Sequence, residues 1–592
     1  MNYLALLVVL LALMAYAVFV FIRLGFPQRL VQLWNMPASL SGVLEQASRK
    51  HGDRVLIELQ QPLAWAGPAS ACWSAPQILA ATGKLASVWR MLGVARGERV
   101  AIYKANQFDI FLFSSAAIRL GAVATPINAN VAGATAARYM ETMGASMLVT
   151  DQAGYARLFC DPAVTAPAGL RQVVISDAAP GSPAKAAQGS APASLAALME
   201  LALPQAPMVE LGGEDPVYIV HTSGTTGTPK GVILASRGLV QSLRSALLFN
   251  FVSRRDVVYL ALPLNHQVAQ LYLHGVLLMG VRCLLNLDFD GPRILQTLQA
   301  RRPSVFFAFP ITYTRMMAAG AAALPLDSVR IWGTTADASH EVQQRAFLGK
   351  GRFFTELGIP KRGALFVDGL GSSEVGIAAL LRIATPWTTR FERRVGRPMP
   401  FGPKLKIADA AGLPVARGAA GLLMIKGACM FAGYWNAHAT LYAASRDGWW
   451  FTGDVVRQDG RGEFVHLDRE VDVMHGPDGP VYTLPMEEIV LQYPGVLDTC
   501  VFAIGDGAGS DRPAAVVALC DDAAPIAPEA LRAALNARLP AREQLHYLWV
   551  VPWSEFPIGA TGKTLKRLLR HSYGALTTAA GDEAARTCTQ AA

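Results

Sequence analysis

A loop rich in glycine and hydroxyl side chains lies between two apolar runs of this chain and carries one lysine. Its residues are Thr222, Ser223, Gly224, Thr225, Thr226, Gly227, Thr228, Pro229, Lys230 and Gly231. Glycines let the backbone turn its N–H groups inward, hydroxyl groups add donors, and Lys230 adds a positive charge, so the composition suits a polyphosphate. A Walker A loop has a glycine before the lysine and a helix after it, whereas Pro229 precedes Lys230 and an apolar, strand-like run follows. Taken alone, the loop could also be an ordinary hairpin.

This loop resembles the phosphate-binding signature of the AMP-forming adenylating enzymes, the superfamily of acyl-CoA synthetases, firefly luciferases and peptide-synthetase adenylation domains. Further matching motifs follow in order from about residue 40 to about residue 570. The resemblance implies that Lys230 is a catalytic residue that holds the ATP phosphates, together with loop residues Thr222, Ser223, Gly224, Thr225, Thr226 and Gly227. It also implies ATP, Mg²⁺ and CoA as the cofactor and substrates.

A second motif, Phe366 to Glu374, resembles the family's tyrosine-glycine-x-threonine-glutamate element. The resemblance implies that Glu374 is catalytic and binds Mg²⁺, which prefers oxygen ligands and would be shared with the ATP phosphates. It implies that Ser373 contacts the α-phosphate and that Gly371 borders the substrate pocket. The sequence departs from the family at Leu370, where an aromatic residue usually stacks on adenine.

Two further motifs lie in the C-terminal third of the chain. The run ending in Asp454 resembles the family's threonine-glycine-aspartate element, which implies that the Asp454 carboxylate accepts hydrogen bonds from the ribose hydroxyls. Arg469 matches the arginine that also reaches the ribose near the interdomain hinge, although Val471 replaces the usual hinge aspartate. Lys563 matches the catalytic lysine that offsets the negative charge of the reacting carboxylate and the α-phosphate.

Two residues of the N-terminal domain are assigned to the acyl and adenine region by the same resemblance. His266 follows an apolar run and matches a histidine at the acyl pocket, although a histidine in this position is also commonly a packed or capping residue. Gly333 matches the glycine-rich turn beside the adenine and the acyl group.

The implied reaction follows from the poor reactivity of a carboxylate, which would have to expel oxide. Adenylation supplies a better leaving group, because the carboxylate attacks the α-phosphorus of MgATP and forms an acyl adenylate with release of pyrophosphate. We expect transfer to CoA and release of AMP, with a medium- to very-long-chain fatty acid as substrate. An aromatic acid, an acyl carrier protein as acceptor, or a catalytically weak membrane-bound scaffold that binds lipid or nucleotide are the alternatives.

The amino-acid composition limits which partners and which cellular compartment we expect for this protein. The formal charge is +9, yet only 16% of the residues are charged and no lysine- or arginine-rich block occurs, so we expect no nucleic-acid partner. The seven cysteines are scattered without zinc-like spacing, which is typical of reduced thiols in a cytosolic protein.

The N-terminus carries about twenty residues without a charge, from Tyr3 to Ile22. Such a stretch is long enough to cross the hydrocarbon core as a helix. Arg23 and Arg29 follow it, so the positive-inside rule predicts a single-pass membrane anchor (1–26) with the catalytic domains in the cytoplasm. A cleaved signal peptide is the alternative.

The remaining sequence predicts an α/β protein of two domains. Helical and short apolar strand patterns alternate from about residue 40, which favours a large multi-sheet N-terminal domain (40–467). A smaller, mobile α+β domain (468–575) and a disordered tail (576–592) are expected to follow it. Residues 161–206, rich in alanine, proline, glycine and serine, are interpreted as a surface excursion outside the core.

Overall fold

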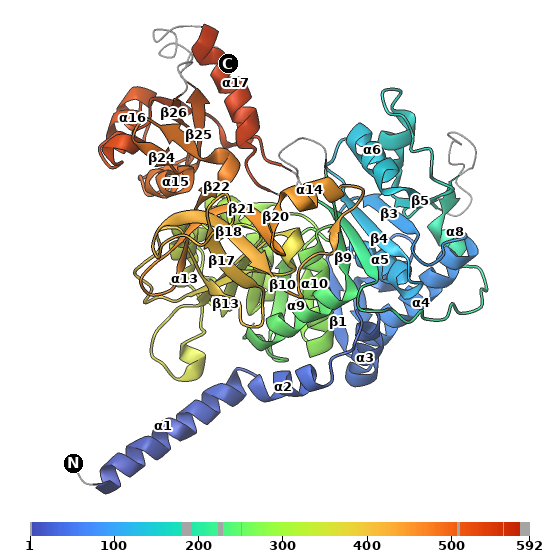
Figure 1. Ribbon diagram of the computed structural model, residues 1–592. Coiled ribbons are helices and arrows are strands. Elements are labelled where there is room, and N and C mark those ends of the chain that lie inside the picture. The colour runs from blue at the N-terminus through green and yellow to red at the C-terminus, as the bar shows by residue number, and fades with distance from the viewer. Residues whose placement is uncertain are drawn as a thin grey trace.

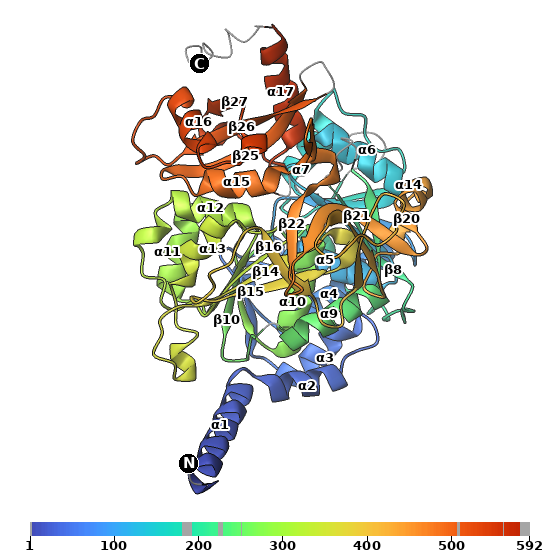
Figure 2. The ribbon, with the colours of Figure 1, turned by 60° about the vertical axis from the view of Figure 1, so that its left-hand side comes forward.

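The computed structural model describes residues 3–179, 192–222, 229–249, 251–505, 510–559 and 562–579. A large body forms the centre of the molecule, a small C-terminal domain lies on one end, and an N-terminal helix projects from the other (Figures 1 and 2). The predicted α/β class, with several sheets and a separate C-terminal domain, is therefore confirmed.

The larger sheet of the body has a parallel central part and an antiparallel flank. The central strands Val305–Ala308, a continuous apolar run, and Ile331–Thr335 are buried throughout, which is typical of parallel strands covered on both faces. In spatial order its strands are β17 (Lys404–Ala408), β18 (Ala420–Lys426), β21 (Trp449–Gln458), β22 (Phe464–Arg469), β16 (Arg394–Pro398), β15 (Leu380–Ala384), β14 (Leu365–Leu370), β13 (Ile331–Thr335), β12 (Val305–Ala308), β10 (Val257–Ala261), β11 (Arg282–Leu285), β1 (Val55–Leu59) and β2 (Cys72–Ser74), with β20 (Ser445–Arg446) beside β21.

The second sheet contains the two strands that flank the glycine-rich loop. Strands β8 and β9 pair antiparallel, with His221 opposite Gly231, so the predicted strand, loop and strand are confirmed. In spatial order the sheet consists of β19 (Gly433–Tyr434), β9 (Gly231–Ala235), β8 (Pro216–His221), β4 (Val123–Asn128), β3 (Arg99–Lys104), β5 (Ala145–Thr150), β6 (Gln172–Ile175) and β7 (Ala193–Ser194).

The interpretation of residues 161–206 as a surface excursion is wrong in part. Strand β6 pairs parallel with β5, and Val174 and Leu195 are buried in the core. The short apolar run of β6 gains its place from pairing with a neighbouring strand, and the small residues around it hide that signal. Residues 180–191 lie outside the described residues.

Helices cover the sheets of the body. A capping box begins α4: Gln77 N donates to Ser74 Oγ (3.4 Å) and Ser74 N donates to Gln77 Oε1 (2.8 Å). Gly93 (φ 88°) follows the end of this helix. The body helices are α3 (Gly42–His51), α4 (Ala75–Met91), α5 (Asp109–Arg119), α6 (Gly133–Met143), α7 (Gln152–Tyr155), α8 (Leu195–Met199), α9 (Ser236–Phe249), α10 (Gln267–Met279), α11 (Gly291–Arg301), α12 (Pro310–Ala318), α13 (Glu341–Leu348) and α14 (His438–Ala443).

An aromatic cluster holds the central parallel strands in place. The ring of Tyr313 lies 5.2 Å from Phe347 and 5.3 Å from Phe366, and Trp332 packs 4.8 Å from Phe347. The Tyr313 hydroxyl donates to the carbonyl oxygen of Gly333 (2.9 Å). The carboxyl ends of β12, β13 and β14 are thereby fixed side by side, which is where ligands bind in sheets of this kind.

The C-terminal domain is small and has a core of its own. Strands β25 (Val496–Gly505), β26 (Asp511–Leu519) and β27 (Tyr547–Val550) form one sheet, and β23 (Met474–Gly476) pairs with β24 (Gly479–Val481). Three helices pack beside them: α15 (Thr483–Leu491), α16 (Pro528–Asn536) and α17 (Lys566–Ala579). Helix α17 continues four residues past 575, where a disordered tail is predicted to begin, and residues 580–592 lie outside the described residues.

Two helices at the N-terminus are bent against each other. Helix α1 (Tyr3–Arg23) and helix α2 (Phe26–Trp34) meet at Gly25 (φ 75°) with an angle of 55°. Within the described residues, no helix alone has the length and apolar composition to cross a membrane, but this bent pair together meets both criteria.

Candidate active site

The residues at the base of the glycine-rich loop place Lys230 beside the second sheet. The backbone N–H of Thr222 donates to the carbonyl oxygen of Lys230 (3.1 Å), which closes the base of the loop. A Cβ atom at Gly231 would come within 2.5 Å of the Met143 sulfur, so a larger residue where the chain leaves the loop would displace the Met143 side chain. The predicted contacts Ser223, Gly224, Thr225, Thr226 and Gly227 lie outside the described residues.

Tyr434 links the loop lysine to the predicted magnesium ligand. The Lys230 ammonium lies 5.7 Å from the centre of the Tyr434 ring. The Tyr434 hydroxyl donates to Glu374 Oε1 (3.0 Å). Burial and the negative charge of Glu374 raise the pKa of Tyr434, so it stays a neutral donor. Tyr434 is part of β19, which pairs with β9 directly after the loop.

Glu374 and Ser373 lie in a short helical turn that follows β14. Both side chains are buried, and the backbone N–H of Phe431 donates to the carbonyl oxygen of Glu374 (2.9 Å). Gly371 packs closely, since a Cβ there would lie 2.9 Å from Ala378 Cα. Leu370 is buried among apolar side chains of the neighbouring strands.

Asp454 and Arg469 stand opposite each other on β21 and β22. Arg469 Nη1 donates to Asp454 Oδ1 (2.9 Å), and His466 Nε2 lies 3.4 Å from the same oxygen. Burial would raise the pKa of Asp454, but the positive charges of Arg469 and, more weakly, of His466 and Lys563 hold that pKa well below its usual range. Asp454 is therefore an ionised acceptor at neutral pH.

Lys563 reaches the N-terminal domain from a tight turn of the C-terminal domain. Its Nζ atom lies 3.5 Å from Asp337 Oδ2 at the carboxyl end of β13. The turn is closed by the Gly559 N–H, which donates to the Lys563 carbonyl oxygen (2.8 Å), and Gly562 adopts a φ of 79°. Although burial raises the pKa of Asp337, the charges of Lys563 and Arg393 lower it to about 2.

The electrostatics of Arg469 show that these pairs share one site. The carboxylates of Asp454, Glu374 and Asp337 all raise the pKa of Arg469, with Asp454 as the largest cause. The predicted ribose, magnesium and lysine elements therefore converge around one guanidinium, although they come from strands β13, β14, β21 and β22 and from the C-terminal domain.

His266 begins α10, and its ring lies near the same site. Its Nδ1 accepts a hydrogen bond from Val268 N (3.3 Å), and its ring contacts Phe309 edge-on at 5.3 Å. Burial, with smaller contributions from His221 and Lys563, lowers the pKa of His266 to about 4. His266 is therefore neutral at pH 7, and it acts as a helix cap besides any contact with substrate.

Gly333 leaves room for an aromatic side chain at the edge of this site. A Cβ at Gly333 would lie 2.5 Å from the Phe307 ring. The ring of Tyr272 packs 4.6 Å from Phe307. Phe307 therefore lies directly against the glycine that the sequence assigns to the acyl and adenine region.

Comparison with known proteins places this architecture in a family. Residues 43–435 match the family described as AMP-binding enzyme. This chain belongs to that family of AMP-binding enzymes. The predicted recognition as an adenylating enzyme is thereby confirmed.

The relatives of this AMP-binding enzyme differ in what they act on. It is 29% identical over 506 residues to a 3-aminoavenalumate diazotase of a Streptomyces species, covering 82% of this chain and 86% of that one. It is 26% identical over 511 residues to the long-chain-fatty-acid–CoA ligase FadD13 of Mycobacterium tuberculosis, covering 84% and 93%. The acid–CoA ligases among the relatives support the predicted class, an AMP-forming acid–thiol ligase.

Solved structures show the same fold at low sequence identity. The crystal structure of the anthranilate CoA ligase AuaEII in complex with anthranoyl-AMP superimposes with a TM-score of 0.77 at 19% identity, over 91% of this chain and 98% of that one. An o-succinylbenzoate CoA synthetase of Bacillus subtilis, solved with ATP and a magnesium ion, gives a TM-score of 0.71 at 19% identity, over 89% and 99%.

A buried ion-pair cluster docks the two domains of this AMP-binding enzyme. Glu488 on α15 of the C-terminal domain lies 2.7 Å from His340 Nδ1 and 3.3 Å from Arg393 Nη1, and it accepts from the Glu341 backbone N–H (3.0 Å). Burial alone would raise the pKa of Glu488, but His340 and Arg393 lower it to about 2. This cluster holds the domain that carries Lys563 against the body.

Several residues of the site were not singled out by the sequence analysis. They are Asp337, Tyr434, His466, His221 and Glu488. Tyr434 lies in the run Gly433-Tyr434-Trp435, which resembles the family's glycine-tyrosine-tryptophan element, and Asp337 ends the run that carries Gly333, so both could have been found from those motifs. His466, His221 and Glu488 have no local signal. Each acquires its place by packing against a residue far away in the sequence.

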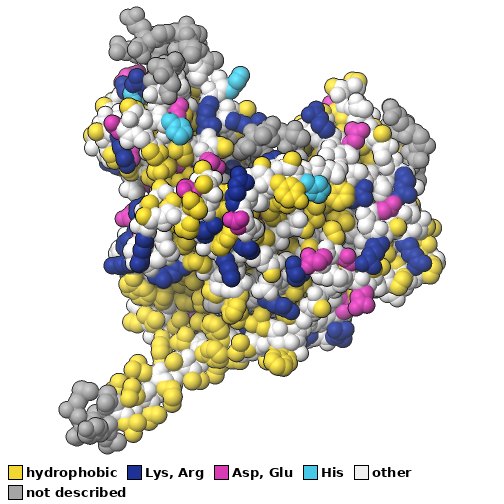
Figure 3. All heavy atoms as spheres, viewed as in Figure 1, with side chains coloured by type: hydrophobic (Ala, Val, Ile, Leu, Met, Phe, Trp, Pro, Cys, Tyr) yellow, Lys and Arg dark blue, Asp and Glu magenta, His cyan; other side chains and the backbone are white. Residues whose placement is uncertain are grey.

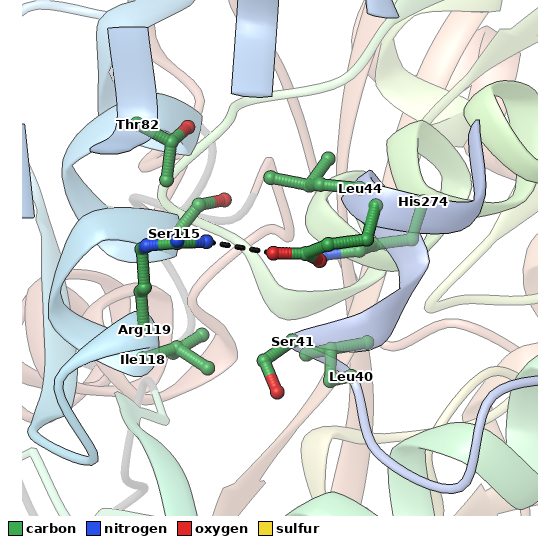
Figure 4. A pocket seen from close by; sticks show the side chains of 9 residues that line it. Leu40, Ser41, Leu44, Thr82, Ser115, Ile118, Arg119 and His274 are labelled. Carbon is green, nitrogen blue, oxygen red and sulfur yellow. Dashed lines mark hydrogen bonds and ion pairs between the residues drawn. The ribbon is translucent and has the colours of Figure 1, made fainter. Parts of the chain in front are cut away.

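A small cavity lies apart from this site, between α3, α4, α5 and α10 (Figure 4). The Arg119–Glu45 ion pair (2.6 Å) crosses it. Among the described residues, the Oγ atoms of Thr82 and Ser115 have no protein partner there. The cavity volume of ≈ 10 Å³ suits about one water molecule. We therefore interpret it as a hydration site and not as a second active site.

Proposed function

We propose that this enzyme activates a carboxylic acid with MgATP and transfers the acyl group to CoA. The arrangement of the three predicted elements carries this proposal: Asp454 pairs with Arg469 (2.9 Å), Lys563 lies 3.5 Å from Asp337, and the carboxylates of Asp337 and Glu374 both act on Arg469. In the first step a carboxylate oxygen attacks the α-phosphorus and the bond to the β-phosphate oxygen breaks, which gives an acyl adenylate and pyrophosphate. In the second step the CoA sulfur attacks the acyl carbon, AMP leaves, and the thiol proton passes to solvent.

Each residue contributes positioning or charge and none contributes a covalent bond. Lys230 holds the β- and γ-phosphates, and Asp454 orients the ribose through hydrogen bonds to its hydroxyl groups. Lys563 leaves Asp337 and offsets the repulsion between the substrate carboxylate and the α-phosphate. In these roles the residues lower the activation energy mainly by electrostatic stabilisation of the transition state.

Glu374 is the residue that would hold magnesium. No cluster of three or more metal-ligating side chains occurs in the described part of the chain, and a single carboxylate completed by phosphate oxygens fits the way Mg²⁺ binds in nucleotide sites. The ion supplies neutralisation of the phosphate charge. Tyr434 fixes the orientation of the Glu374 carboxylate by donating to Oε1.

A fatty acid of medium to very long chain is the first candidate for the substrate. The support is the apolar N-terminal pair α1 and α2, which we propose anchors the enzyme to a membrane with the catalytic domains on the cytoplasmic side. An anchored enzyme meets membrane-soluble acids at high local concentration. The anchor is tested by flotation of the full chain with liposomes after a carbonate wash, and recovery in the soluble fraction would overturn it.

An aromatic acid is the second candidate, and Phe307 favours it. Its ring fills the space beside Gly333 and packs at an angle of 42° against Tyr272, so a flat ring would pack well there. The diazotase relatives are named for amino-substituted aromatic acids. Phe307→Ala should enlarge this space and improve kcat/KM for long aliphatic acids relative to aromatic ones.

Pyrophosphate release from MgATP tests the reaction directly. The purified protein is incubated with fatty acids of increasing length, cinnamate-type acids and an aminobenzoate, with and without CoA. Release together with an acyl-CoA product supports the proposal and identifies the substrate class. Pyrophosphate release without a thioester indicates a carrier protein as acceptor. Absence of pyrophosphate release with every acid favours a nucleotide- or lipid-binding scaffold.

A further inference from the structure

Helix α2 exposes three apolar residues on its outer face, while its Phe26 and Leu33 are partly buried against the core of the body. Leu30, Val31 and Trp34 are 51%, 54% and 91% exposed, whereas Arg29 and Gln32 on the same helix are buried. A surface helix in water shows the opposite pattern, with its polar face outward. The inverted pattern indicates that an apolar medium covers the outer face of α2.

The buried polar residues of α2 are held by backbone carbonyl groups of the body. The Arg29 guanidinium donates to the carbonyl oxygen of Leu248 (3.3 Å), and Gln32 Nε2 donates to that of Leu278 (2.8 Å). These contacts come from α9 and α10, so α2 is fixed with its apolar face outward. The exposure of Trp34 is therefore a consequence of specific polar contacts on the opposite side.

Helix α1 is bound to the body well before it ends. The Tyr16 hydroxyl donates to the carbonyl oxygen of Leu357 (2.8 Å), and Arg23 lies 3.7 Å from Glu356. Tyr16 precedes Arg23 by seven residues, which is about 10 Å along a helix. A bilayer that surrounds α1 up to Arg23 would therefore also reach the body segment around Leu357.

That body segment carries exposed apolar side chains of its own. The Trp387 ring packs 4.5 Å from Phe354, one turn before Leu357, and remains 51% exposed. Ile383 on the neighbouring strand β15 is 39% exposed. In the space-filling view the apolar surface of α1 continues onto the adjoining body without a break (Figure 3).

Basic side chains border this surface. Lys361 and Arg362 follow Leu357 closely in the chain and are exposed, and the Arg352 side chain is 48% exposed. Arg352 pairs with Glu356 (2.9 Å) and Arg362 pairs with Asp327. Long basic side chains can place their apolar stems beside acyl chains and their charges among anionic head groups. The surface therefore matches the polarity profile of a lipid bilayer from its interior to its head groups.

We propose that the outer face of α2 and the surface around Ile383 and Trp387, together called the docking face, lie in the head-group and upper acyl region of a phospholipid bilayer. The inference rests on the proposed membrane attachment by α1 and adds that the body itself enters the membrane surface. The C-terminal domain lies at the end opposite to α1 (Figure 2). The docking face therefore orients the domain that carries Lys563 away from the lipid.

Native tryptophans report on this contact in the full chain, because α1 contains none. The protein is reconstituted into vesicles of phosphatidylcholine with 20% phosphatidylglycerol, in which the phosphatidylcholine acyl chains are either brominated or not. Brominated chains quench only tryptophans close to lipid. Trp34→Phe and Trp387→Phe are compared with the wild type and with Trp435→Phe, a control residue that packs 5.2 Å from Arg99 in the second sheet.

The proposal expects that each of the two docking-face variants loses part of the quenched intensity, that the double variant loses at least half of it, and that Trp435→Phe loses none. If the protein floats with the vesicles but the fluorescence of Trp34→Phe and Trp387→Phe is quenched as much as that of the wild type, the docking face does not contact lipid. That result overturns the inference but leaves the α1 anchor in place. If that result is accompanied by a dimer in light scattering, a second copy covers the face instead. Failure to float overturns the anchor, and pyrophosphate release tests catalysis independently of both.

Discussion

The ion-pair cluster around Glu488 predicts that one substitution at the domain boundary selectively slows adenylation. All three partners of this carboxylate, His340, Arg393 and the Glu341 N–H, belong to the body. The energy of these contacts therefore belongs to the docking of the C-terminal domain and not to its internal stability. We expect Glu488→Gln to favour the undocked arrangement, in which Lys563 is withdrawn from the site.

The pKa of Glu488 gives the size of the effect. It falls from an ordinary value of 4.5 to about 2, and each pKa unit corresponds to about 1.4 kcal/mol, so the carboxylate stabilises docking by about 3 kcal/mol. Loss of one partner from a buried pair costs a similar amount. A change of 3 kcal/mol shifts the docking equilibrium by a factor of about 150. Adenylation should fall by a factor of about 10 to 150, depending on how fully the wild type is docked.

The sign of the pH dependence follows from the lowered pKa. The contribution of Glu488 is fully present above its ordinary pKa of 4.5 and is lost only as the pH falls toward 2. Titration of the Glu488 carboxyl group therefore adds no pH dependence to the ratio of wild-type to Glu488→Gln adenylation rates between pH 6 and 8.

The assay separates the two half-reactions. Adenylation is measured by exchange of labelled pyrophosphate into ATP, and thioester formation is measured from added acyl adenylate and CoA. The first should fall in Glu488→Gln and the second should not, with the exposed Glu529→Gln on α16 as the matched control. An equal decrease in both half-reactions, or an unchanged exchange rate, would refute the assignment of Glu488 to domain docking.

Three further predictions concern single residues. Lys563→Ala should lower adenylation by about 10²- to 10³-fold, the usual cost of one preorganised transition-state charge, and unchanged pyrophosphate exchange would show that Lys563 is not catalytic. Gly376→Ala should lower the Tm by several degrees, because the φ of Gly376 is 86° and a Cβ there would lie 2.1 Å from a serine oxygen on α9. Gly320→Ala is the control, since Gly320 has a similar φ of 80° but faces open space, and its Tm should fall clearly less. Equal decreases in Tm would disprove the contact argument. His274, whose pKa is lowered by burial from 6.5 to about 4, stays neutral while the unfolded chain binds a proton, so stability is lost as pH falls from 6.5 toward 4. Between pH 7.5 and 5.5 the wild type should therefore lose about 1.3 kcal/mol more of its folding free energy than His274→Gln, which is measured as a larger fall in Tm. Parallel curves of Tm against pH for the two proteins would contradict the lowered pKa of His274.

Local sequence patterns were sufficient for most of the elements and for the family. The two strands around the glycine-rich loop and the alternation of helices and strands from about residue 40 follow from apolar periodicity and from turn residues. They were predictable because the information lies within one short stretch of chain. Strand β6 was missed because its short apolar run becomes a strand only through parallel pairing with β5.

The N-terminal helices likewise combine features that the local sequence predicts with features that depend on tertiary contacts. Composition predicts the apolar helix α1, but the bend at Gly25 and the outward face of α2 depend on contacts with α9 and α10. The prediction that Tyr3 to Ile22 spans a membrane by itself is not supported by the described residues, which instead provide a bent pair.

The sequence by itself determined which residue types this enzyme brings to its chemistry: a phosphate loop with Lys230, the carboxylates Glu374 and Asp454, and a lysine at position 563. Only the tertiary structure decided their partners. Asp337 meets Lys563, Tyr434 orients Glu374, and Glu488 docks the domain that carries the lysine. The physical reason is that charge pairing acts over a few ångströms in space, and residues separated by 60 to more than 200 positions approach each other only when sheets and domains pack.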